Sequence, residues 1–314
     1  MKVLVTGGAG FIGSNLVRAL LGRGDEVRVL DNFSTGQRAN LDGLEVEVVE
    51  GELRSYERVH NAVRGAEVVF HLGALGSVPR SVQDPLTSGA VNVEGTLNVM
   101  LAARDEGIRR VVFASSSSIY GNQPELPLRE TMAPDPISPY GVAKLAAERY
   151  CVSFSRVYSS FETVVLRYFN VFGPRQDPTS QYAAVVPLFV TAIAASEPVT
   201  IFDDGEQSRD FTYVDNVVAA NLLAADAEGV SGRIFNVSAG APVTVNELAE
   251  RIGVLLDKPV QRRYLPARAG DLRDSWADVS QARELLGFEP TIDIGEGLRR
   301  TATFLLEGQD ARGA

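Results

Sequence analysis

Tyr140 and Lys144 are two side chains that can share the transfer of a proton. They stand four residues apart in the segment SPYGVAKLAAERY (residues 138–150), so one helical turn places them on the same face. Tyrosine acts as a base only when it is ionised, and a nearby positive charge favours that form. The same spacing is also common on solvent-exposed helices, so the pair indicates a reactive centre only if other groups converge on it.

A serine at the end of a predicted strand is the third polar group. RVVFASS (residues 110–116) is typical of a buried strand, and it opens a run of four serines at 115–118. Ser116 therefore stands at the carboxyl end of a strand, and the helix with Tyr140 and Lys144 follows it. A strand end and a following helix can bring these three side chains together over a bound ligand.

The elements that must position these groups alternate between strands and helices. Runs rich in Val, Leu and Phe predict strands at residues 2–6, 26–31, 46–51, 67–72, 110–116 and 162–170. Amphipathic stretches predict helices at residues 12–23, 56–64, 92–106, 139–158, 244–256 and 279–288. This alternation predicts an α/β fold with a Rossmann-type, doubly wound parallel sheet.

A glycine-rich turn joins the first strand to the first helix. In VLVTGGAGFIGSNL the residues Gly7, Gly10 and Gly13 form G-x-x-G-x-x-G, a spacing variant of the dinucleotide-binding fingerprint. Glycines allow the backbone to approach a pyrophosphate at the helix N-terminus. Asp31 ends the second strand, where a carboxylate accepts the adenosine ribose hydroxyls and repels a 2′-phosphate. The pattern predicts NAD rather than NADP.

The predicted cofactor site extends along the carboxyl ends of the neighbouring strands. Its residues are Gly7, Gly10, Phe11, Ile12, Gly13, Asp31, Asn32, Ser34, Glu52, Leu53, Leu72, Ala74, Asn92, Tyr140, Lys144 and Tyr168. Residues 1–170 are predicted to form the NAD-binding domain, to which a segment at about 210–238 returns. Residues 171–314 are predicted to form mainly a smaller α/β substrate domain, because glycine, proline and polar residues become frequent after residue 170.

Composition excludes several classes of function. Thirty basic and 40 acidic residues give a net charge of −10, which disfavours binding to nucleic acid. One cysteine and two histidines, Cys151, His60 and His71, offer neither an internal disulfide nor a zinc site at any ligand spacing. The sequence has no stretch of transmembrane length and no signal-peptide pattern at residue 1. We therefore expect a cytoplasmic protein that binds neither a metal nor a membrane.

With these motifs in order, the chain resembles the extended short-chain dehydrogenases/reductases, and among them the NAD-dependent nucleotide-sugar 4-epimerases. The resemblance spans nearly the whole chain and is carried by TGGAGFIGSNL, SSSSIYG, SPYGVAK, RYFNVFGPRQ, SRDFTYVDN and GDLRDSWADVSQARELLG. It implies that Tyr140 is the acid/base, that Lys144 holds the nicotinamide ribose and tunes Tyr140, and that Ser116 orients the substrate. It also implies a homodimer formed through the helices at 92–106 and 139–158.

Two serines separate the possible reactions within this family. The 4,6-dehydratases carry an Asp-Glu pair, and the UDP-glucuronate decarboxylases a Glu, where this chain has Ser117 and Ser118. Neither serine takes up a proton near pH 7. The resemblance therefore implies inversion at C4 through a transient 4-keto sugar. A dehydratase or decarboxylase is the alternative, and a non-catalytic NAD-binding scaffold would not be expected to keep Ser116, Tyr140 and Lys144.

The resemblance implies a UDP-sugar as substrate. The implied substrate-binding residues are Gly76, Ser77, Ser116, Ser117, Asn170, Arg175, Val185, Arg209, Arg268, Asp271 and Ser275. Ser275 stands where epimerases that exclude N-acetyl sugars carry a tyrosine, which implies a larger pocket. Arg175 resembles an arginine of the UDP-glucuronate epimerases. UDP-glucose, UDP-N-acetylglucosamine and UDP-glucuronate all stay open.

Four further positions bear on the predicted sites. Arg80 and Arg273 are additional candidates for contact with an acidic sugar. Glu52 stands where the family usually has Asp, and Gly73 where it usually has Ala. These two departures affect the predicted adenine and nicotinamide surroundings and remove no catalytic group.

Overall fold

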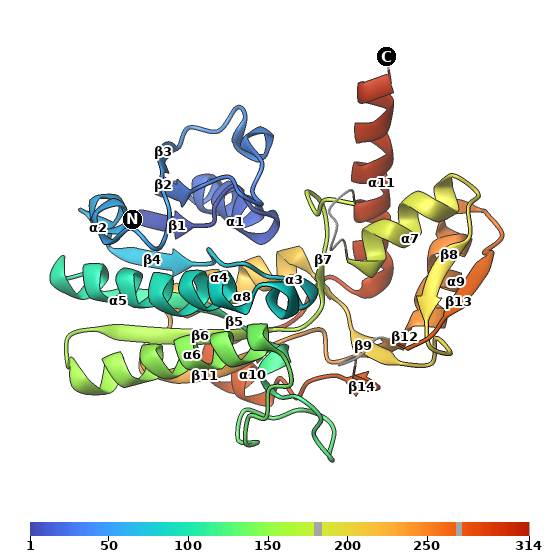
Figure 1. Ribbon diagram of the computed structural model, residues 1–314. Helices are drawn as coiled ribbons and strands as arrows, with labels where there is room; N and C mark the ends of the chain where they lie inside the picture. Colours follow the sequence, from blue (N-terminus) through green and yellow to red (C-terminus); the bar gives the residue numbers. More distant parts are fainter. Residues whose placement is uncertain (179–183, 268–271, 314) are drawn as a thin grey trace.

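A seven-stranded parallel sheet forms the centre of the larger part of the molecule (Figure 1). In this computed structural model, which describes residues 1–178, 184–267 and 272–313, the strand order is β11-β6-β5-β4-β1-β2-β3. The strands are β1 (Lys2–Thr6), β2 (Glu26–Asp31), β3 (Glu47–Glu50), β4 (Val68–His71), β5 (Arg110–Ser116), β6 (Glu162–Tyr168) and β11 (Arg233–Val237). Since the order runs outward in both directions from β1, the predicted Rossmann-type doubly wound sheet is confirmed.

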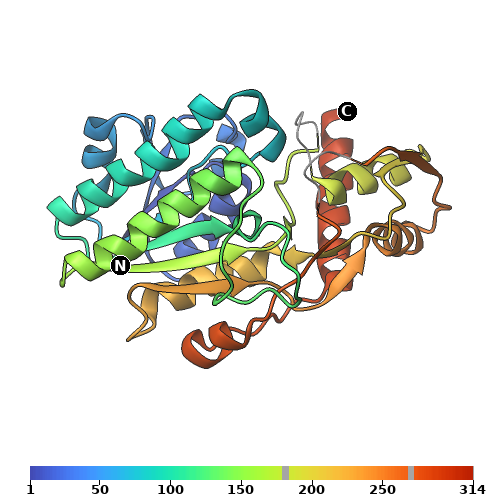
Figure 2. The same cartoon turned by 60° about the horizontal axis from the view of Figure 1, so that its bottom comes forward.

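Helices cover both faces of this sheet (Figures 1 and 2). One layer contains α2 (Tyr56–Val63), α5 (Gly95–Asp105) and α6 (Pro139–Val157), and the other contains α1 (Phe11–Gly22) and α8 (Val214–Asp226). Successive strand residues point to opposite faces, so Val3 and Val5 pack in the cluster beneath α1, whereas Leu4 packs in the cluster beneath α5. Both faces are apolar, which explains the nearly continuous hydrophobic runs of the strands.

Short helices between β4 and α5 depart from the sequence-based expectation. The segment after β4 forms α3 (Val78–Gln83), α4 (Pro85–Gly89) and the π-helical turn η2 (Ala90–Glu94) before α5 begins. Two polar side chains start the short helices, because Ser77 accepts a hydrogen bond from Arg80 N and Asp84 accepts one from Thr87 N. The helix predicted at 92–106 therefore starts as a π-helical turn, and α3 and α4 are too short to give a periodic pattern.

The C-terminal part builds a smaller α/β unit beside the sheet (Figure 1). Its helices are α7 (Val185–Ala194), α9 (Val245–Leu256) and α11 (Ile294–Gly313), whereas α10 (Ser280–Leu286) packs against β11 and α8 of the large sheet. Its short strands are β7 (Val171–Phe172), β8 (Val199–Phe202), β9 (Ser208–Asp210), β10 (Thr212–Tyr213), β12 (Pro242–Thr244), β13 (Arg262–Leu265) and β14 (Asp274–Ser275). Thr244 and Glu247 form a capping box at the start of α9, and Gly287 ends α10 with a φ of 68°.

The chain re-enters the large sheet after the first strands of the smaller unit. α8 packs on the sheet, and β11 pairs in parallel with β6, from Arg233 opposite Val164 to Val237 opposite Tyr168. The domain boundary at residue 170 stays a prediction. Within the described ranges, no helix is both long enough and apolar enough to cross a membrane, and no group of three or more His, Cys, Asp or Glu side chains is arranged to hold a metal ion.

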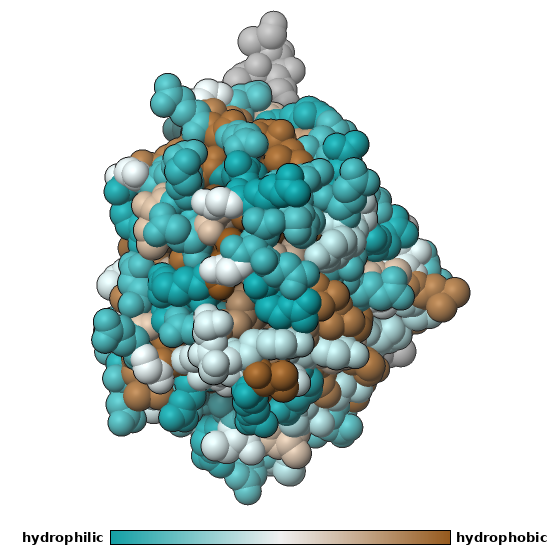
Figure 3. All heavy atoms as spheres, turned by 90° about the vertical axis from the view of Figure 1, so that its left-hand side faces the viewer, coloured by the Kyte–Doolittle hydropathy of each residue, from teal (hydrophilic) through white to brown (hydrophobic). Residues whose placement is uncertain are grey.

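One face of the molecule is mainly hydrophilic. Figure 3 shows the left-hand side of Figure 1, and its hydrophobic residues lie scattered among hydrophilic ones. The smaller unit lies at the opposite end of the molecule, on the right of Figure 1. The predicted catalytic and cofactor residues stand at carboxyl ends of strands, the edge where parallel α/β sheets bind their ligands.

Candidate active site

The carboxyl end of β5 and the first turns of α6 bring the three predicted catalytic residues together. Tyr140 and Lys144 lie one turn apart near the start of α6, and Ser116 is the last residue of β5. The Ser116 side chain lies near enough to Tyr140 to act on the pKa of its phenol. The Lys144 ammonium donates a hydrogen bond of 2.8 Å to the carbonyl oxygen of Ala114. A serine hydroxyl, a phenol and an ammonium thus share one end of the strand, as the sequence predicts.

The local sequence explains why α6 begins at this place. Ser138 caps the helix by accepting a 3.1 Å hydrogen bond from the backbone N–H of Gly141. Pro139 occupies the first helical position, where a missing N–H costs nothing. Tyr140 is the next residue, so the capping motif determines where its side chain leaves the helix.

Burial changes the pKa values of both α6 residues. It raises the pKa of Tyr140 above its usual value, and the Ser116 side chain acts in the opposite direction. Burial lowers the pKa of Lys144 to about 8. Lys144 also lies over the Phe113 ring, with its nitrogen 4.9 Å from the ring centroid. Proton abstraction requires a lower Tyr140 pKa than burial alone gives. Added positive charge would lower it, and the oxidised nicotinamide of NAD carries such a charge.

The run of serines after β5 continues the site. Ser117 begins a short 3₁₀ turn, η3 (Ser117–Ile119), directly beyond Ser116. The Ser118 hydroxyl lies 2.8 Å from the Ser116 hydroxyl, and Ser118 N donates to Ser116 Oγ at 3.2 Å. Of the two positions at which the resemblance places acids in dehydratases and decarboxylases, Ser118 thus directs its hydroxyl at Ser116, and Ser117 follows Ser116 directly in the chain.

The glycine turn has the shape that a dinucleotide pyrophosphate requires. Gly7 has a φ of 71°, and a Cβ at Gly13 would lie 2.1 Å from the Gly7 carbonyl oxygen. No side chain caps α1, whose N-cap residue is Gly10. A helix N-terminus without a side-chain cap has backbone N–H groups available for an anionic group. The glycines of the turn, which lack side chains, allow the close backbone approach. Phe11 and Ile12 are the first residues of that helix.

The Asp31 carboxylate stands beside the glycine turn. It accepts hydrogen bonds from Ala9 N at 2.9 Å and Phe33 N at 2.8 Å. Burial raises the Asp31 pKa, whereas these backbone bonds act to lower it. Asn32 donates to Glu52 at 3.2 Å, so these two rim residues lie together. The carboxylate fits the adenosine ribose of NAD, and the glycine turn fits its pyrophosphate.

The loop after β4 packs against the glycine turn. A Cβ at Gly7 would lie 2.8 Å from the Cα of Gly73, and a Cβ at Gly73 would lie 3.0 Å from Leu53. Gly73 therefore suits this close approach. The Asn92 side chain bonds to both the N–H and the carbonyl of Leu75, at 2.8 and 3.2 Å. Asn92 thus holds the loop that contains Leu72, Ala74, Gly76 and Ser77.

His71 is part of the buried core behind this loop. Its Nδ1 lies 2.7 Å from the Thr6 hydroxyl, and its Nε2 lies 3.0 Å from the Thr96 hydroxyl. Thr96 donates its proton to Asn92 O, so the His71 Nε2–H is the donor to Thr96. Burial lowers the pKa of His71 to about 3, and the ring is neutral near pH 7. Cys151 is likewise buried and packs against Met100.

Tyr168 lies on the other side of the sheet from the catalytic helix. Its Cα pairs with that of Ser116, but its hydroxyl bonds to Asn221 of α8, at 3.0 Å. Because strand residues alternate, Arg167 points toward α6 and Tyr168 points away from it. Asn170 follows this strand, has a φ of 32°, and accepts a hydrogen bond from Thr212 N.

The predicted substrate residues of the smaller unit gather on β9 and β14. Ser275 of β14 pairs with Arg209 of β9, and its side chain is buried. The Arg209 guanidinium donates to the carbonyls of Leu272, at 2.6 Å, and Arg273, at 3.1 Å. Val185 begins α7. Arg268 and Asp271 lie outside the residues that the structure describes.

The predicted arginines for an acidic sugar have other contacts. Arg175 donates a hydrogen bond to Asn15 of α1 and lies over the Phe304 ring, with 5.6 Å between its guanidinium carbon and the ring centroid. Arg273 forms a 2.7 Å ion pair with Asp204 on the exposed surface. Both guanidinium groups are therefore directed at protein groups. Arg80 lies on α3. This helix packs against α6, which follows the strand that ends at Ser116.

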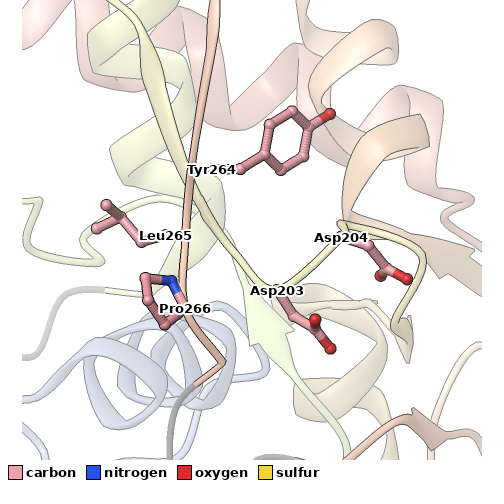
Figure 4. A pocket seen from close by; sticks show the side chains of 5 residues that line it. All are labelled: Asp203, Asp204, Tyr264, Leu265 and Pro266. Carbon is pink, nitrogen blue, oxygen red and sulfur yellow. The ribbon is translucent and has the colours of Figure 1, made fainter.

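A hollow in the smaller unit is distinct from this site (Figure 4). It is lined by Asp203, Asp204, Tyr264, Leu265 and Pro266 and has a volume of about 510 Å³. The two carboxylates at its edge both lie within ion-pair distance of Arg273, at 3.6 Å from Asp203 and 2.7 Å from Asp204.

Sequence reasoning missed two residues behind the site. Ser81 of α3 accepts a hydrogen bond from the backbone N–H of Tyr140, at 3.0 Å. Glu148 is fully buried on α6 and forms an ion pair of 2.7 Å with Arg167. Glu148 stands one turn after Lys144 among apolar residues, a pattern that indicates a buried acid. Ser81 gave no comparable signal, because α3 itself was not predicted.

The comparisons with known proteins agree with this geometry. The profile of the NAD dependent epimerase/dehydratase family matches residues 3–238. A UDP-glucose 4-epimerase of Mycolicibacterium smegmatis is 40% identical over 97% of this chain and 98% of that protein. The crystal structure of the UDP-glucose 4-epimerase of Thermotoga maritima with UDP-glucose superposes with a TM-score of 0.94, at 39% identity, covering 98% of this chain and 100% of that one.

Relatives with other substrates or reactions are also similar. A UDP-N-acetylglucosamine 4-epimerase structure from Methanobrevibacter ruminantium has a TM-score of 0.93 and 39% identity, covering 98% of each chain. A UDP-glucuronic acid decarboxylase of Arabidopsis thaliana is 34% identical over 96% of this chain and 68% of that protein. Similarity alone therefore leaves the sugar open.

Proposed function

The chain belongs to the NAD-dependent epimerase/dehydratase family, and on that premise we propose that it interconverts the C4 epimers of neutral UDP-hexoses. UDP-glucose and UDP-N-acetylglucosamine are the proposed substrates. The observation that carries this proposal is the meeting of Ser116, Tyr140 and Lys144 at the end of β5, with hydroxyl groups at positions 117 and 118. This set can remove and return a hydroxyl proton, and it lacks the acids that elimination or decarboxylation uses.

In the proposed mechanism, Tyr140 takes the proton from the C4 hydroxyl and later returns it to the opposite epimer. Ser116, at the end of β5 beside Tyr140, would orient that hydroxyl. Lys144, held by the Ala114 carbonyl, supplies a positive charge that favours the ionised phenol. NAD, when bound, accepts the C4 hydride and gives it back to the other face of the sugar.

The cofactor is proposed to lie across the carboxyl edge of the sheet. Gly7, Gly10 and Gly13 would approach its pyrophosphate, and Asp31 would bind the adenosine ribose. The carboxylate at Asp31 supports NAD over NADP, since a 2′-phosphate would meet a buried acid. Lys144 would hold the nicotinamide ribose.

Two features of the smaller unit support neutral substrates. Ser275 is buried on β14, and its side chain is smaller than the tyrosine that the resemblance associates with exclusion of N-acetyl sugars. Arg175 and Arg273 have partners in the protein, so these two arginines do not stand ready for a hexuronate carboxylate. Arg209 also has partners, the carbonyls of Leu272 and Arg273, so a diphosphate at this predicted position would share the guanidinium with them.

A homodimer is part of the proposal. On α6 the side chains of Val142, Tyr150 and Val157 are 53%, 41% and 67% exposed, and helical periodicity places them on one side of the helix. Val82 and Leu86 of the adjoining α3 and α4 are also exposed. A second copy would cover this apolar surface. Light scattering after size exclusion is expected to give twice the monomer mass, and a monomer at micromolar concentration would refute the dimer.

The experiment that tests the reaction is product analysis by NMR. The purified protein is incubated separately with UDP-glucose, UDP-N-acetylglucosamine and UDP-glucuronate. We expect UDP-galactose and UDP-N-acetylgalactosamine from the first two. A 4-keto-6-deoxy sugar would show a dehydratase, and release of CO₂ from the third would show a decarboxylase. Rapid epimerisation of UDP-glucuronate alone would overturn the proposed neutral specificity.

A further inference from the structure

Ser81 connects the predicted substrate loop to the catalytic tyrosine. It lies on α3, and only 1% of its surface is exposed. Its oxygen accepts a 3.0 Å hydrogen bond from the backbone N–H of Tyr140. Its own proton goes to the Val78 carbonyl at 2.7 Å, which fixes the direction of the hydroxyl. The contact with Tyr140 is therefore an oriented hydrogen bond between two helices.

The first turn of α6 needs this acceptor. The first N–H groups of a helix have no partners within the helix. Pro139 has no N–H, the Ser138 side chain accepts from Gly141, and the Ser138 carbonyl accepts from Val142. The Tyr140 N–H is the donor of this turn whose acceptor comes from another element, and that acceptor is Ser81.

The segment of residues 73–81, which we name the strap, is held along its length. It starts at Gly73, whose Cα would lie 2.8 Å from a Cβ at Gly7 of the cofactor turn. In its middle, the Asn92 side chain bonds to both backbone groups of Leu75. Its last residue makes the bond to Tyr140. The strap thus runs from the glycine turn, through the predicted sugar-binding residues, to the catalytic helix.

We propose that Ser81 is a positioning residue for Tyr140, through which the strap sets the place of the catalytic phenol. This inference rests on the proposed function, because it takes Tyr140 as the group that moves the proton. A displacement of about 1 Å in a reacting group lowers a rate by about 100-fold. Ser81 holds the backbone of Tyr140 itself, so its loss would move the phenol while the substrate and cofactor keep their own contacts.

The test is the Ser81→Ala variant beside Ser155→Ala as a matched control. Ser155 is a partly buried serine far along α6, and it donates to the Val152 carbonyl at 2.9 Å. We expect Ser81→Ala to lower kcat between about 10- and 100-fold, with little change in the KM for UDP-glucose or in bound NAD. The limb of the pH–kcat profile that reports Tyr140 should also shift. Ser155→Ala should match the wild type in each measurement.

A second measurement does not depend on activity. Hydrogen exchange of the peptide covering residues 138–142 should be faster in Ser81→Ala, because the Tyr140 N–H loses its acceptor. A Ser81→Thr variant keeps the acceptor oxygen and should recover most of kcat. If the wild type does not epimerise UDP-glucose, the proposed function fails, whereas hydrogen exchange still tests the contact between Ser81 and Tyr140.

Three results would overturn the inference. The first is a Ser81→Ala variant with wild-type kcat and pH profile. The second is a loss of activity that follows the unfolded fraction, since that would show a purely structural role. The third is a Ser81→Thr variant with the wild-type melting temperature that stays as slow as Ser81→Ala, because the hydroxyl oxygen would then not be the cause.

Discussion

The Arg167 guanidinium donates two hydrogen bonds to the Glu148 carboxylate, of 3.0 Å from Nε and 2.7 Å from Nη2, and both side chains are fully buried. Glu148 also accepts a 2.9 Å hydrogen bond from Ser115, the neighbour of the catalytic serine. Arg167 donates onward to the Tyr120 hydroxyl at 2.7 Å. This polar group ties α6 to β5 and β6 directly behind the site.

Removal of one partner from this pair should destabilise the protein strongly. Glu148→Ala leaves the Arg167 charge buried without compensation, which costs about 3–5 kcal/mol of unfolding free energy. The double variant Glu148→Leu/Arg167→Met should lose less unfolding free energy than the two single variants lose together. Urea denaturation measures these losses. Glu125→Ala, which breaks the exposed pair of Glu125 with Arg129, should cost less than about 1 kcal/mol. Additive single effects would contradict the coupling of Glu148 with Arg167.

The glycine turn gives a prediction about cofactor binding. A Cβ at Gly13 would lie 2.1 Å from the Gly7 carbonyl oxygen, so Gly13→Ala must displace the turn. NAD binding, measured by calorimetry, should become undetectable. Gly22 lies in the same helix with no atom within 4 Å of an added Cβ, so Gly22→Ala should retain NAD and raise stability by about 0.5–1 kcal/mol. Wild-type NAD affinity in Gly13→Ala would exclude this turn as the pyrophosphate site.

Ser275 provides a test of the substrate pocket. Ser275→Tyr places a bulky ring next to Arg209, so kcat/KM for UDP-N-acetylglucosamine should fall at least about tenfold relative to that for UDP-glucose. Retained turnover of UDP-glucose shows that the variant is folded. Ser280→Tyr places the same side chain on the exposed start of α10 and should leave the ratio unchanged. An unchanged ratio in Ser275→Tyr would mean that this position does not face the 2-substituent.

His71 makes the stability depend on pH in a defined direction. Its pKa is about 3 in the folded protein, against a usual value of 6.5, because burial disfavours the charged ring. Between these values the unfolded chain binds the proton more tightly, so stability is complete above pH 6.5 and falls as the pH is lowered toward 3. At pH 5 the loss relative to pH 7 should be about 2 kcal/mol. In His71→Gln, urea denaturation should show a smaller loss over this interval, and an equal loss would assign the effect to other groups.

Patterns of residue type were enough to predict the parallel sheet and the placement of Ser116, Tyr140 and Lys144 at one end of β5. Val-rich strands and the capping residues Ser138 and Thr244 act locally, so their positions can be read from neighbouring residues. The glycine turn was equally clear, because only glycine tolerates the Gly7 backbone angle beside the close approach of Gly13. These predictions depend on short-range chemistry.

Long-range contacts were beyond the same reasoning. The direction of Arg175 depends on Asn15 and Phe304, which are distant in the sequence. The contact of Ser81 with Tyr140 depends on α3, a helix too short for a periodic signal. Tyr168 and its predicted place beside the cofactor also depend on tertiary structure, because strand alternation sends its hydroxyl to Asn221. To predict the roles of these residues, one must know how separate elements pack together.

The most direct test of the account is the rate of UDP-glucose epimerisation by Tyr140→Phe, followed by NMR. Tyr150→Phe, an exposed tyrosine on the same helix, is the matched control and should turn over like the wild type. Loss of the proton carrier should lower kcat by about 10²–10⁴-fold, while the affinities for UDP-glucose and NAD are retained. A Tyr140→Phe enzyme that epimerises UDP-glucose within a few-fold of the wild-type rate would contradict the assignment of Tyr140 as the acid/base.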